Sequence, residues 1–390
     1  MSESKAKRAS FLVFGAPAVG TEEADAVREV ILSGWMGTGP KTKLFEDRFR
    51  SHVGRQHAVA VNSCTAALFL SLHALDLQPG DEVITTPLTF AATANVVEHV
   101  GARLVFVDVD AATGLIDPEA VRAAVTRRTR ALLPVHLYGR ACAMGELREI
   151  CERHGLIMVE DCAHAIETTF AGRRVGTFGK VGCYSFYVTK NLTTVEGGML
   201  LTDDAHFAER LKRLALHGMT ADAWARFSDR GYKHYQVVEP GFKFNMTDMQ
   251  AAMGLVQLEK LEAMLARREE LWQHYDDGLR DLPLELPPPA SPGSVHARHL
   301  YTVLVDEARS GISRDRMMDE LHQRNIGTGV HYVGQHLQPY YRDKYGLRPD
   351  NFPRATRHSL QTLSLPLSPR LTKRDVDDVV AAVRDVLHQA

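Results

Sequence analysis

Three side chains near the middle of the chain have the chemistry of a catalytic centre. Lys190 lies in the run SFYVTKN at 185–191, with no acidic residue immediately beside it. A lysine in such semi-apolar surroundings has a depressed pKa and can form a Schiff base with a carbonyl compound. Asp161 and His164 lie in the run EDCAHA after an apolar stretch, where a buried carboxylate requires a cation. The competing interpretations are an exposed lysine, a capping aspartate and a structural histidine.

Two segments rich in small residues are suited to hold an anionic group. The run NSCTAA at 62–67 lies between a predicted strand and a predicted helix. Exposed N–H groups at the start of that helix, together with its dipole, favour a bound phosphate. A simple turn capped by Ser63 or Thr65 is the alternative interpretation. Gly197 and Gly198 form the second segment, and paired glycines suit a tight turn or a close backbone approach.

Several common catalytic motifs are absent from the sequence. It contains no HExxH, GxGxxG or GxSxG run, and Gly176–Lys180 is followed by Val181, which breaks the P-loop pattern. The 5 cysteines include no CxxC pair. The sequence therefore gives no support to ATP, NAD or metalloprotease chemistry. We expect no metal site and no disulfide scaffold.

The elements that must position these residues alternate between strands and helices. Apolar runs at 58–61, 82–86, 104–109, 131–137 and 156–161 predict buried strands, and the segments 65–75, 90–100, 117–126 and 145–154 predict helices. Asp117 followed by Pro118 is typical of a helix start, and Gly155 occupies a C-cap position. The alternation predicts a mostly parallel sheet with helices on both faces. Ligands bind such sheets beyond the carboxyl ends of the strands, where the candidate residues lie.

The pattern changes after residue 182. Two strand-like runs, GCYSFY and GGMLLT, are joined by a polar loop, and helices are predicted over 203–216 and 248–280. A proline-rich stretch follows, and then a strand at 299–306 and helices at 313–324 and 372–388, which predict a smaller α+β unit. We place the domain boundary between 245 and 290. The predicted domains are 1–250, a large domain whose segment 1–40 forms an active-site loop and arm, and 251–390, a linking helix with a small C-terminal domain.

The composition excludes several classes of partner. The chain has 390 residues, 46 Lys+Arg against 48 Asp+Glu, and a formal net charge of −2. A nearly neutral chain argues against a nucleic-acid partner, which favours a basic surface. No segment is predicted to span a membrane and the N-terminus has no apolar signal region, so we expect no membrane partner. The odd number of cysteines favours a reducing compartment, the cytoplasm.

The ordered set of motifs resembles the sugar aminotransferases of the DegT/DnrJ/EryC1/StrS family. The resemblance extends from the segment at 33–46 to the C-terminal helix and rests on the order and spacing of its parts. The motifs are NSCTAAL (62–68), TFAATAN (89–95), EDCAHA (160–165), SFYVTKN (185–191), EGG (196–198), GFKFNMTDMQAAMGLVQLEKL (241–261), VHYVGQHLQPYY (330–341) and LSLPLSPRLT (363–372). The family implies the α/β fold of pyridoxal-phosphate-dependent transferases of fold type I. It also implies a homodimer with active sites at the subunit interface.

The resemblance assigns roles to the catalytic candidates. Lys190 matches the lysine that binds pyridoxal 5′-phosphate covalently and shuttles a proton. Asp161 matches the carboxylate that pairs with the pyridinium nitrogen and keeps the ring an electron sink. His164 stands where many members have Gln, and it contacts the phenolic oxygen or lies over the ring. Phe90 matches the aromatic residue that stacks on the ring.

Further positions match binding segments of the family. Thr65, Ala66 and Ser185 match the phosphate cradle of the cofactor. Lys243 and Asn245 lie in the segment that reaches the phosphate in the neighbouring subunit, and which of the two makes the contact stays open. The loop Gly37-Thr38-Gly39 and the residue His331 resemble segments that line the sugar side.

The implied reaction is a ping-pong transamination. L-glutamate converts the cofactor to pyridoxamine 5′-phosphate and leaves as 2-oxoglutarate, and a keto group on a nucleotide-linked sugar then takes the amino group. Alternatives are amination of a carbocycle or a free keto-sugar, a sugar dehydratase of the same fold, and a non-catalytic cofactor-binding regulator. Family dehydratases have His in place of the lysine, so Lys190 argues against that reaction. An intact Asp161 and Lys190 argue against a regulator.

One departure from the family concerns the loop after Lys190. Many members read TTGEGG, whereas this chain has Val195 in place of the first glycine. If that position requires a positive φ, the valine is strained there. We therefore expect the shape of this loop to differ and to affect the substrate more than the cofactor.

Overall fold

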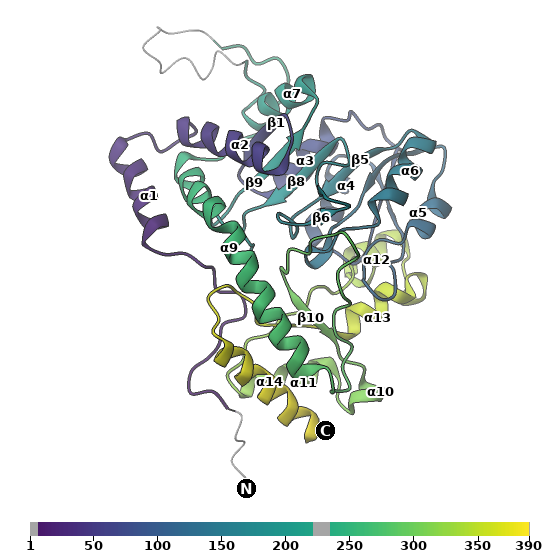
Figure 1. Cartoon of the computed structure of the whole chain (residues 1–390). Coiled ribbons are helices and arrows are strands. Elements are labelled where there is room, and N and C mark those ends of the chain that lie inside the picture. The colour runs from purple at the N-terminus through teal and green to yellow at the C-terminus, as the bar shows by residue number, and fades with distance from the viewer. Residues whose placement is uncertain (1–6, 221–234, 390) are drawn as a thin grey trace.

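The computed structural model describes residues 7–220 and 235–389, so the first six residues of the predicted N-terminal arm lie outside the described residues. A mixed sheet with strand order β1-β9-β8-β5-β4-β2-β3 lies at the centre of the N-terminal part of the chain (Figure 1). Only β9 runs antiparallel to its neighbours in this sheet. The strands are β1 (His57–Val61), β2 (Glu82–Thr85), β3 (Arg103–Phe106), β4 (Thr129–Leu133), β5 (Ile157–Asp161), β8 (Val181–Ser185) and β9 (Gly198–Thr202). The predicted α/β fold with a mostly parallel sheet is confirmed.

Helices cover both faces of this sheet, because successive side chains of each strand point to opposite sides. Val59 and Val61 of β1 pack with α3, α4 and α7, whereas Ala58 and Ala60 pack with α2. As predicted, Asp117 caps α5. The helices are α2 (Pro40–Val53), α3 (Cys64–His73), α4 (Ala91–His99), α5 (Pro118–Ala124), α6 (Met144–His154) and α7 (Ala205–Ala215). Short elements between them are η1 (Leu137–Gly139), β6 (Thr169–Phe170) and β7 (Arg173–Arg174).

A long helix, α9 (Asp248–Leu279), leads from the sheet to the C-terminal part of the chain (Figure 1). Its end contributes Leu271 and Tyr275 to a separate apolar cluster with Val303 and Val379. The elements there are β10 (Tyr301–Leu304), α10 (Glu307–Ser310), α11 (Arg314–Gln323), η2 (Gln335–Leu337), α12 (Pro339–Tyr345), η3 (Pro349–Asn351), α13 (Pro353–Gln361), β11 (Thr362–Leu365) and α14 (Lys373–His388). The division at residue 250 stays a prediction.

Two N-terminal helices, α1 (Thr21–Ser33) and α2, were not predicted from the sequence. Helix α1 lies within the segment expected to be a loop and arm, and it begins at Gly20 without a polar capping side chain. Helix α2 is capped from far along the chain, because the Asp248 carboxylate accepts hydrogen bonds from the N–H groups of Gly39 (2.7 Å) and Thr42 (2.9 Å). Neither start has a local Ser, Thr, Asp or Asn cap, although Pro40 begins α2 and Glu23 binds the N–H of Gly20 (2.8 Å).

Among the described residues, no helix combines the length and the apolar character needed to cross a membrane.

Candidate active site

A cavity of about 430 Å³ lies at the carboxyl ends of the parallel strands. Residues that follow β1, β2, β5 and β8 line it, and residues from the C-terminal part of the chain close it. The principal lining residues are Ser63, Cys64, Thr65, Phe90, Thr93, Asp161, His164, Ser185, Lys190, Glu196, His299, His331 and Tyr332. The structure thus brings residues that are far apart in the sequence to the edge where ligands bind such sheets.

Asp161 is a buried carboxylate without a cationic partner. It is the last residue of β5 and is 4% exposed. Its Oδ2 accepts a hydrogen bond from the Thr93 hydroxyl (2.9 Å), and its Oδ1 accepts one from the Ala163 N–H (3.1 Å). No Lys, Arg or His among the described residues forms an ion pair with it. Burial raises the pKa of Asp161, so the carboxylate favours a ligand that brings a positive charge.

Lys190 lies in the same cavity, in the loop between β8 and β9. Its backbone N–H bonds the carbonyl of Tyr187 (2.9 Å), which fixes a turn before the lysine. Burial lowers the pKa of Lys190 to about 8. At pH 7 about a tenth of the amine is therefore uncharged and nucleophilic, far more than for a lysine with an ordinary pKa.

His164 is held as one neutral tautomer. Its Nδ1 accepts a hydrogen bond from the backbone N–H of Tyr138 (3.1 Å), so the ring proton is on Nε2. Nε2 in turn lies 3.1 Å from the Tyr332 hydroxyl oxygen, to which it donates. Burial lowers the pKa of His164 well below its ordinary value, and the nearby Lys190 lowers it further. His164 is thus a neutral hydrogen-bond donor.

The predicted phosphate cradle is only partly gathered at the cavity. Thr65 and Ser185 line it, and Gly198 packs so closely on Ser63 that an added Cβ would lie 2.5 Å from the Ser63 carbonyl. Ala66 does not line the cavity, and its backbone N–H is bound by the Ser63 hydroxyl (3.1 Å), which caps α3. The turn predicted to bind the phosphate is therefore the turn that caps α3.

Phe90 presents its ring to the cavity. It precedes α4 and is 60% exposed, which is high for a phenylalanine. Its ring centre lies 6.0 Å from that of Tyr332, at an interplanar angle of 52°. The two rings form an aromatic wall on which a planar ligand can pack.

Four of the other predicted site residues lie apart from this cavity within one chain. The side-chain amide of Asn245 donates from Nδ2 to the Thr38 hydroxyl (2.6 Å), and Lys243 Nζ donates to its Oδ1. Gly37 accepts a hydrogen bond from the N–H of Asp248 (2.9 Å). Thr38 and Asn245 line a separate hollow beside the start of α2, so one chain does not join this group to Lys190.

His331 lines the cavity of Lys190, as predicted for the sugar side. Its ring stacks on Phe14, with ring centres 5.3 Å apart, and its Nδ1 lies 2.8 Å from the Ser364 hydroxyl. Burial lowers its pKa to about 4, so the ring is neutral.

Three of the lining residues that contact the catalytic candidates were not identified from the sequence. Thr93 binds Asp161, Tyr332 binds His164, and His299 has its ring centre 4.3 Å from that of His164. Thr93 lies in the motif TFAATAN and Tyr332 in the motif VHYVGQHLQPYY, but nothing local marks either as a site residue. His299 lies two positions before β10, and only the folded chain brings it to the cavity.

The backbone conformation of Val195 confirms the strain expected from the missing glycine. Its φ is +69°, in the left-handed region that a β-branched residue rarely adopts. The next two residues, Glu196 and Gly197, line the cavity. The strained turn therefore lies directly beside the site.

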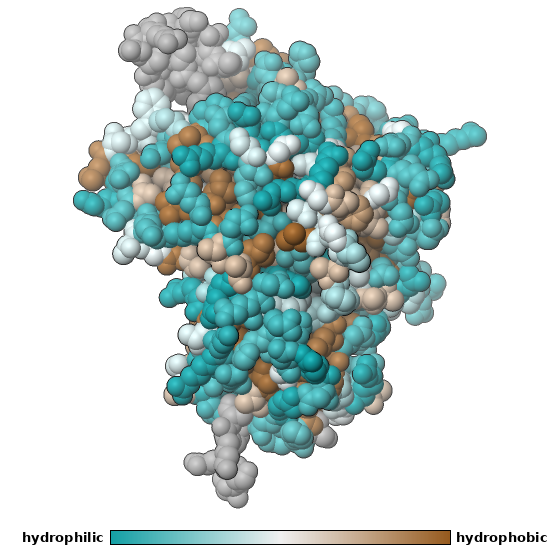
Figure 2. All heavy atoms as spheres, viewed as in Figure 1, coloured by the Kyte–Doolittle hydropathy of each residue, from teal (hydrophilic) through white to brown (hydrophobic). Residues whose placement is uncertain are grey.

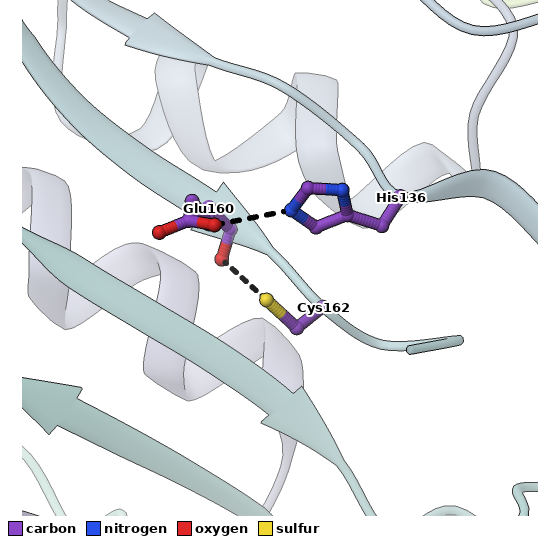
Figure 3. A group of neighbouring side chains, drawn as sticks. All are labelled: His136, Glu160 and Cys162. Carbon is purple, nitrogen blue, oxygen red and sulfur yellow. Dashed lines mark hydrogen bonds and ion pairs between the residues drawn. The ribbon is translucent and has the colours of Figure 1, made fainter. Parts of the chain in front are cut away.

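A second group of polar side chains lies on the other side of β5 and has the composition of a metal site. His136, Glu160 and Cys162 are all buried (Figure 3). The Nδ1 of His136 accepts the backbone N–H of Cys142 (3.1 Å), so Nε2 carries the proton and donates to Glu160 (3.2 Å). Neither ring nitrogen has a lone pair left for a metal ion, and we assign the group a structural role.

The residues of the cavity complement a ligand with a basic ring nitrogen and an aldehyde. The carboxylate of Asp161 forms no ion pair with a described residue and has a raised pKa, and the amine of Lys190 has a lowered pKa. Both groups open to one cavity in an α/β fold with a mixed sheet. Fold and site together define a pyridoxal-phosphate-dependent aminotransferase.

Comparison with known proteins gives the family. The chain belongs to the DegT/DnrJ/EryC1/StrS aminotransferase family, whose model matches residues 17–384. It is 47% identical over 385 residues to the spore coat polysaccharide biosynthesis protein SpsC of Bacillus subtilis, covering 98% of this chain and 99% of SpsC. The protein Spr1654 of Streptococcus pneumoniae has a PMP-form structure with 32% identity and a TM-score of 0.91 over 97% of this chain and 99% of its own.

Two further structures bear on the ligands of this fold. Spr1654 also has a PLP-form structure, with 31% identity and a TM-score of 0.90 over 97% of this chain and 99% of its own. DesI, crystallised in the presence of its TDP-sugar product, has 32% identity and a TM-score of 0.85 over 98% of this chain and 93% of its own. These structures support pyridoxal phosphate as the cofactor.

Proposed function

We propose that this protein transfers the amino group of L-glutamate to a keto group of a nucleotide-linked sugar, using pyridoxal 5′-phosphate. The observation that carries the proposal is the pairing of Asp161, buried without a cation, with Lys190, whose pKa is lowered to about 8, in one cavity. When bound, the cofactor supplies an electron sink for the carbon that loses its proton.

The side chains of the cavity divide the work. Asp161 would hold a proton on the pyridine nitrogen of the bound cofactor. Lys190 would hold the cofactor at its aldehyde group and would move the proton of the substrate carbon. Phe90 packs on the ring. Thr65 and Ser185 bind the phosphate, and His164, as a neutral donor, bonds the phenolic oxygen or covers the ring.

We infer a homodimer that shares its active sites. Lys243 and Asn245 lie outside the cavity of their own chain, which suits side chains that complete the neighbouring site. Large apolar side chains are exposed at Ile31 (51%), Leu32 (73%) and Trp35 (46%). Figure 2 shows hydrophobic residues gathered over α1 and α2, and a patch of this kind suits a subunit contact.

Substrate class and location are proposed by analogy and charge. SpsC is named for polysaccharide biosynthesis, and DesI was crystallised with a TDP-sugar product, so a nucleotide sugar is the favoured acceptor. A chain with a net charge of −2 cannot attract such anions by a general positive field, so local donors must hold them. The buried free cysteines suit a cytoplasmic enzyme.

A two-stage experiment tests this function. The purified holoenzyme should be yellow, and L-glutamate should shift its absorption band as the cofactor takes up the amino group. Nucleotide-linked keto-sugars, free keto-sugars and cyclic ketones are then offered, and products are read by mass for the exchange of oxygen for NH.

Each outcome of this experiment has a defined meaning. We expect only the nucleotide-linked compounds to be aminated. Lys190→Ala should bind the cofactor through its phosphate but show no shift. An unchanged band in the wild-type enzyme would exclude glutamate as the donor, and amination of the free compounds alone would exclude the nucleotide.

A further inference from the structure

The residue after the catalytic lysine has an amide whose orientation the structure fixes. The Asn191 Nδ2 lies 2.8 Å from the carbonyl oxygen of Ala297, which can only accept a hydrogen bond. The same nitrogen donates to the Glu167 carboxylate (2.9 Å). Because both partners of this nitrogen take its protons, Oδ1 is the atom that faces the ring of His299.

This orientation determines the tautomer of His299. The Asn191 Oδ1 lies 2.9 Å from the His299 Nδ1, and an oxygen with no proton requires that Nδ1 donate. Burial keeps the pKa of His299 well below its ordinary value, and Lys190 lowers it further, so the ring is neutral. Its Nε2 is therefore an unprotonated acceptor.

The Nε2 of His299 has no hydrogen-bond partner among the described residues. The side chain is 5% exposed, and Nε2 is not fully enclosed by protein atoms. The residue lines the cavity that contains Lys190. It also lines a small hollow beside Gly15 and Arg268. An acceptor with so little exposure and no partner among the described residues is suited to take a hydrogen bond from a ligand in the cavity, which offsets the cost of its desolvation.

The neighbouring ring is fixed in the opposite state. His164 carries its proton on Nε2, because its Nδ1 accepts the Tyr138 N–H. The two rings lie 4.3 Å apart at an interplanar angle of 40°. The cavity wall thus holds two Nε2 atoms in opposite states, each set by a partner outside the cavity. That of His164 is protonated and donates to the Tyr332 hydroxyl, and that of His299 is an acceptor.

We propose that His299 is a specificity-determining residue whose Nε2 accepts a hydrogen bond from an N–H or O–H group of the substrate. Asn191 is the positioning residue that fixes its tautomer. The part that concerns the substrate rests on the proposed function, whereas the assignment of the tautomers does not.

A buried ion pair anchors this arrangement to the C-terminal part of the chain. Arg268 of α9 pairs with Glu167, and its Nε donates to the Ala297 carbonyl oxygen (3.3 Å). Asn191 thus binds two groups that α9 also holds. The orientation of its amide depends on residues from three distant segments, and this explains why no sequence motif revealed it.

The first test reads the tautomers without any substrate. The holoenzyme is labelled with 15N in its histidine rings, and the spectrum of His299→Phe identifies the signals of His299. We expect a protonated Nδ1 and a lone-pair Nε2 for His299, and the reverse for His164. A protonated Nε2 on His299 would overturn the proposal, whatever the enzyme's substrates are.

The second test measures both half-reactions separately. His299→Phe keeps a ring against His164 but removes the acceptor. Asn191→Leu removes the oxygen that holds the proton of His299 on Nδ1. We expect kcat/KM to fall about tenfold in each, with no further fall in the double variant. The absorption band and the affinity of the cofactor should stay unchanged. His296→Phe is the matched control, since His296 is a buried histidine of the same segment that does not line the cavity.

The pattern of losses identifies the donor group. A fall in both half-reactions assigns the acceptor to the N–H of the amino group that migrates, and a fall in the sugar half-reaction alone assigns it to a sugar hydroxyl. No fall in either half-reaction would overturn the proposed role of His299. If the wild-type enzyme did not react with L-glutamate, the proposed function would fail, and the tautomers would still be decided by the first test.

Discussion

Glu160 and Asp161 are neighbours on β5 whose carboxylates serve opposite purposes. Glu160 is fully buried and accepts hydrogen bonds from the N–H groups of Gly176 (2.7 Å), Phe178 (2.7 Å) and Gly179 (2.6 Å), besides that of His136 (Figure 3). Asp161, which faces the cavity, receives one hydroxyl and one N–H. The two carboxylates are almost equally buried, but Glu160 accepts more hydrogen bonds than Asp161 does.

The two pKa shifts follow this difference. Burial raises the pKa of both carboxyls, but His136 and the backbone amides outweigh it at Glu160, whose pKa is lowered overall. At Asp161 the donors are too few, and the pKa is raised. A saturated buried charge stabilises the fold, whereas an unsaturated one next to a cavity indicates a ligand. Counting partners therefore separates structural from functional polar groups better than burial does.

Exchanging each carboxylate for its amide tests this comparison most directly. Asp161→Asn keeps the hydrogen bond from the Ala163 N–H and lets its new NH₂ group donate to the Thr93 hydroxyl, but it removes the charge that holds a proton on the pyridine nitrogen. We expect kcat to fall at least about 100-fold, with unfolding free energy changed by less than about 1 kcal/mol. Glu160→Gln places an NH₂ group against backbone donors, and we expect a loss of about 2–4 kcal/mol of stability.

Each of the two variants serves as the control for the other. Denaturant unfolding and the rate per folded, cofactor-loaded molecule are measured for each. Folded Glu160→Gln should retain a rate within a few-fold of the wild type. If Asp161→Asn lost stability and Glu160→Gln lost only activity, the assignment of the two sides of β5 would be reversed.

The same contrast explains what the sequence could and could not predict. Asp161 and Lys190 were identified because a strand end and a motif mark them locally, and the parallel sheet followed from the alternation of apolar runs. The donors that decide their chemistry come from elsewhere: Thr93 reaches Asp161 from α4, and His299 arrives from the segment before β10. A single sequence contains no local signal for such contacts.

Helix α2 is a second example of a long-range determinant. Its first N–H groups are bound by Asp248, more than 200 positions away, in place of a local capping residue. The placement of Lys243, Asn245 and Thr38 in one hydrogen-bonded cluster likewise depends on tertiary structure. Sequence motifs named these residues, but only the fold shows that they lie away from their own cavity.

The pH dependence of stability should distinguish Lys190, which lies in the cavity, from Glu160, which lies on the other side of β5. The pKa of Lys190 is about 8, against an ordinary value of 10.5. Between these values the unfolded chain binds more protons than the folded one, so the free energy of unfolding of the cofactor-free protein should rise with pH. Glu160, with its lowered pKa, should act at the acid end, where its contribution is lost as the pH falls through its folded-state value.

Difference curves isolate the contribution of Lys190. Thermal unfolding of cofactor-free wild type and Lys190→Met is followed from about pH 7 to about pH 10.5. The stability of the wild type relative to the variant should increase across this window. Parallel curves would show that the cavity does not lower the pKa of Lys190.

The smallest expected effect concerns Val195, whose strained backbone lies beside the cavity that Asp161 faces. Val195→Gly relieves a left-handed conformation that costs about 1–3 kcal/mol, but glycine adds unfolded-state entropy worth about 1 kcal/mol. We therefore expect a net gain of about 1 kcal/mol in denaturant unfolding. Because the side chain is 57% exposed, little packing is lost, and the change reports mainly the backbone. Val195→Ala removes the branching but keeps Cβ, so it should gain less. A glycine variant no more stable than the alanine variant would mean that the φ of +69° carries no strain at this position.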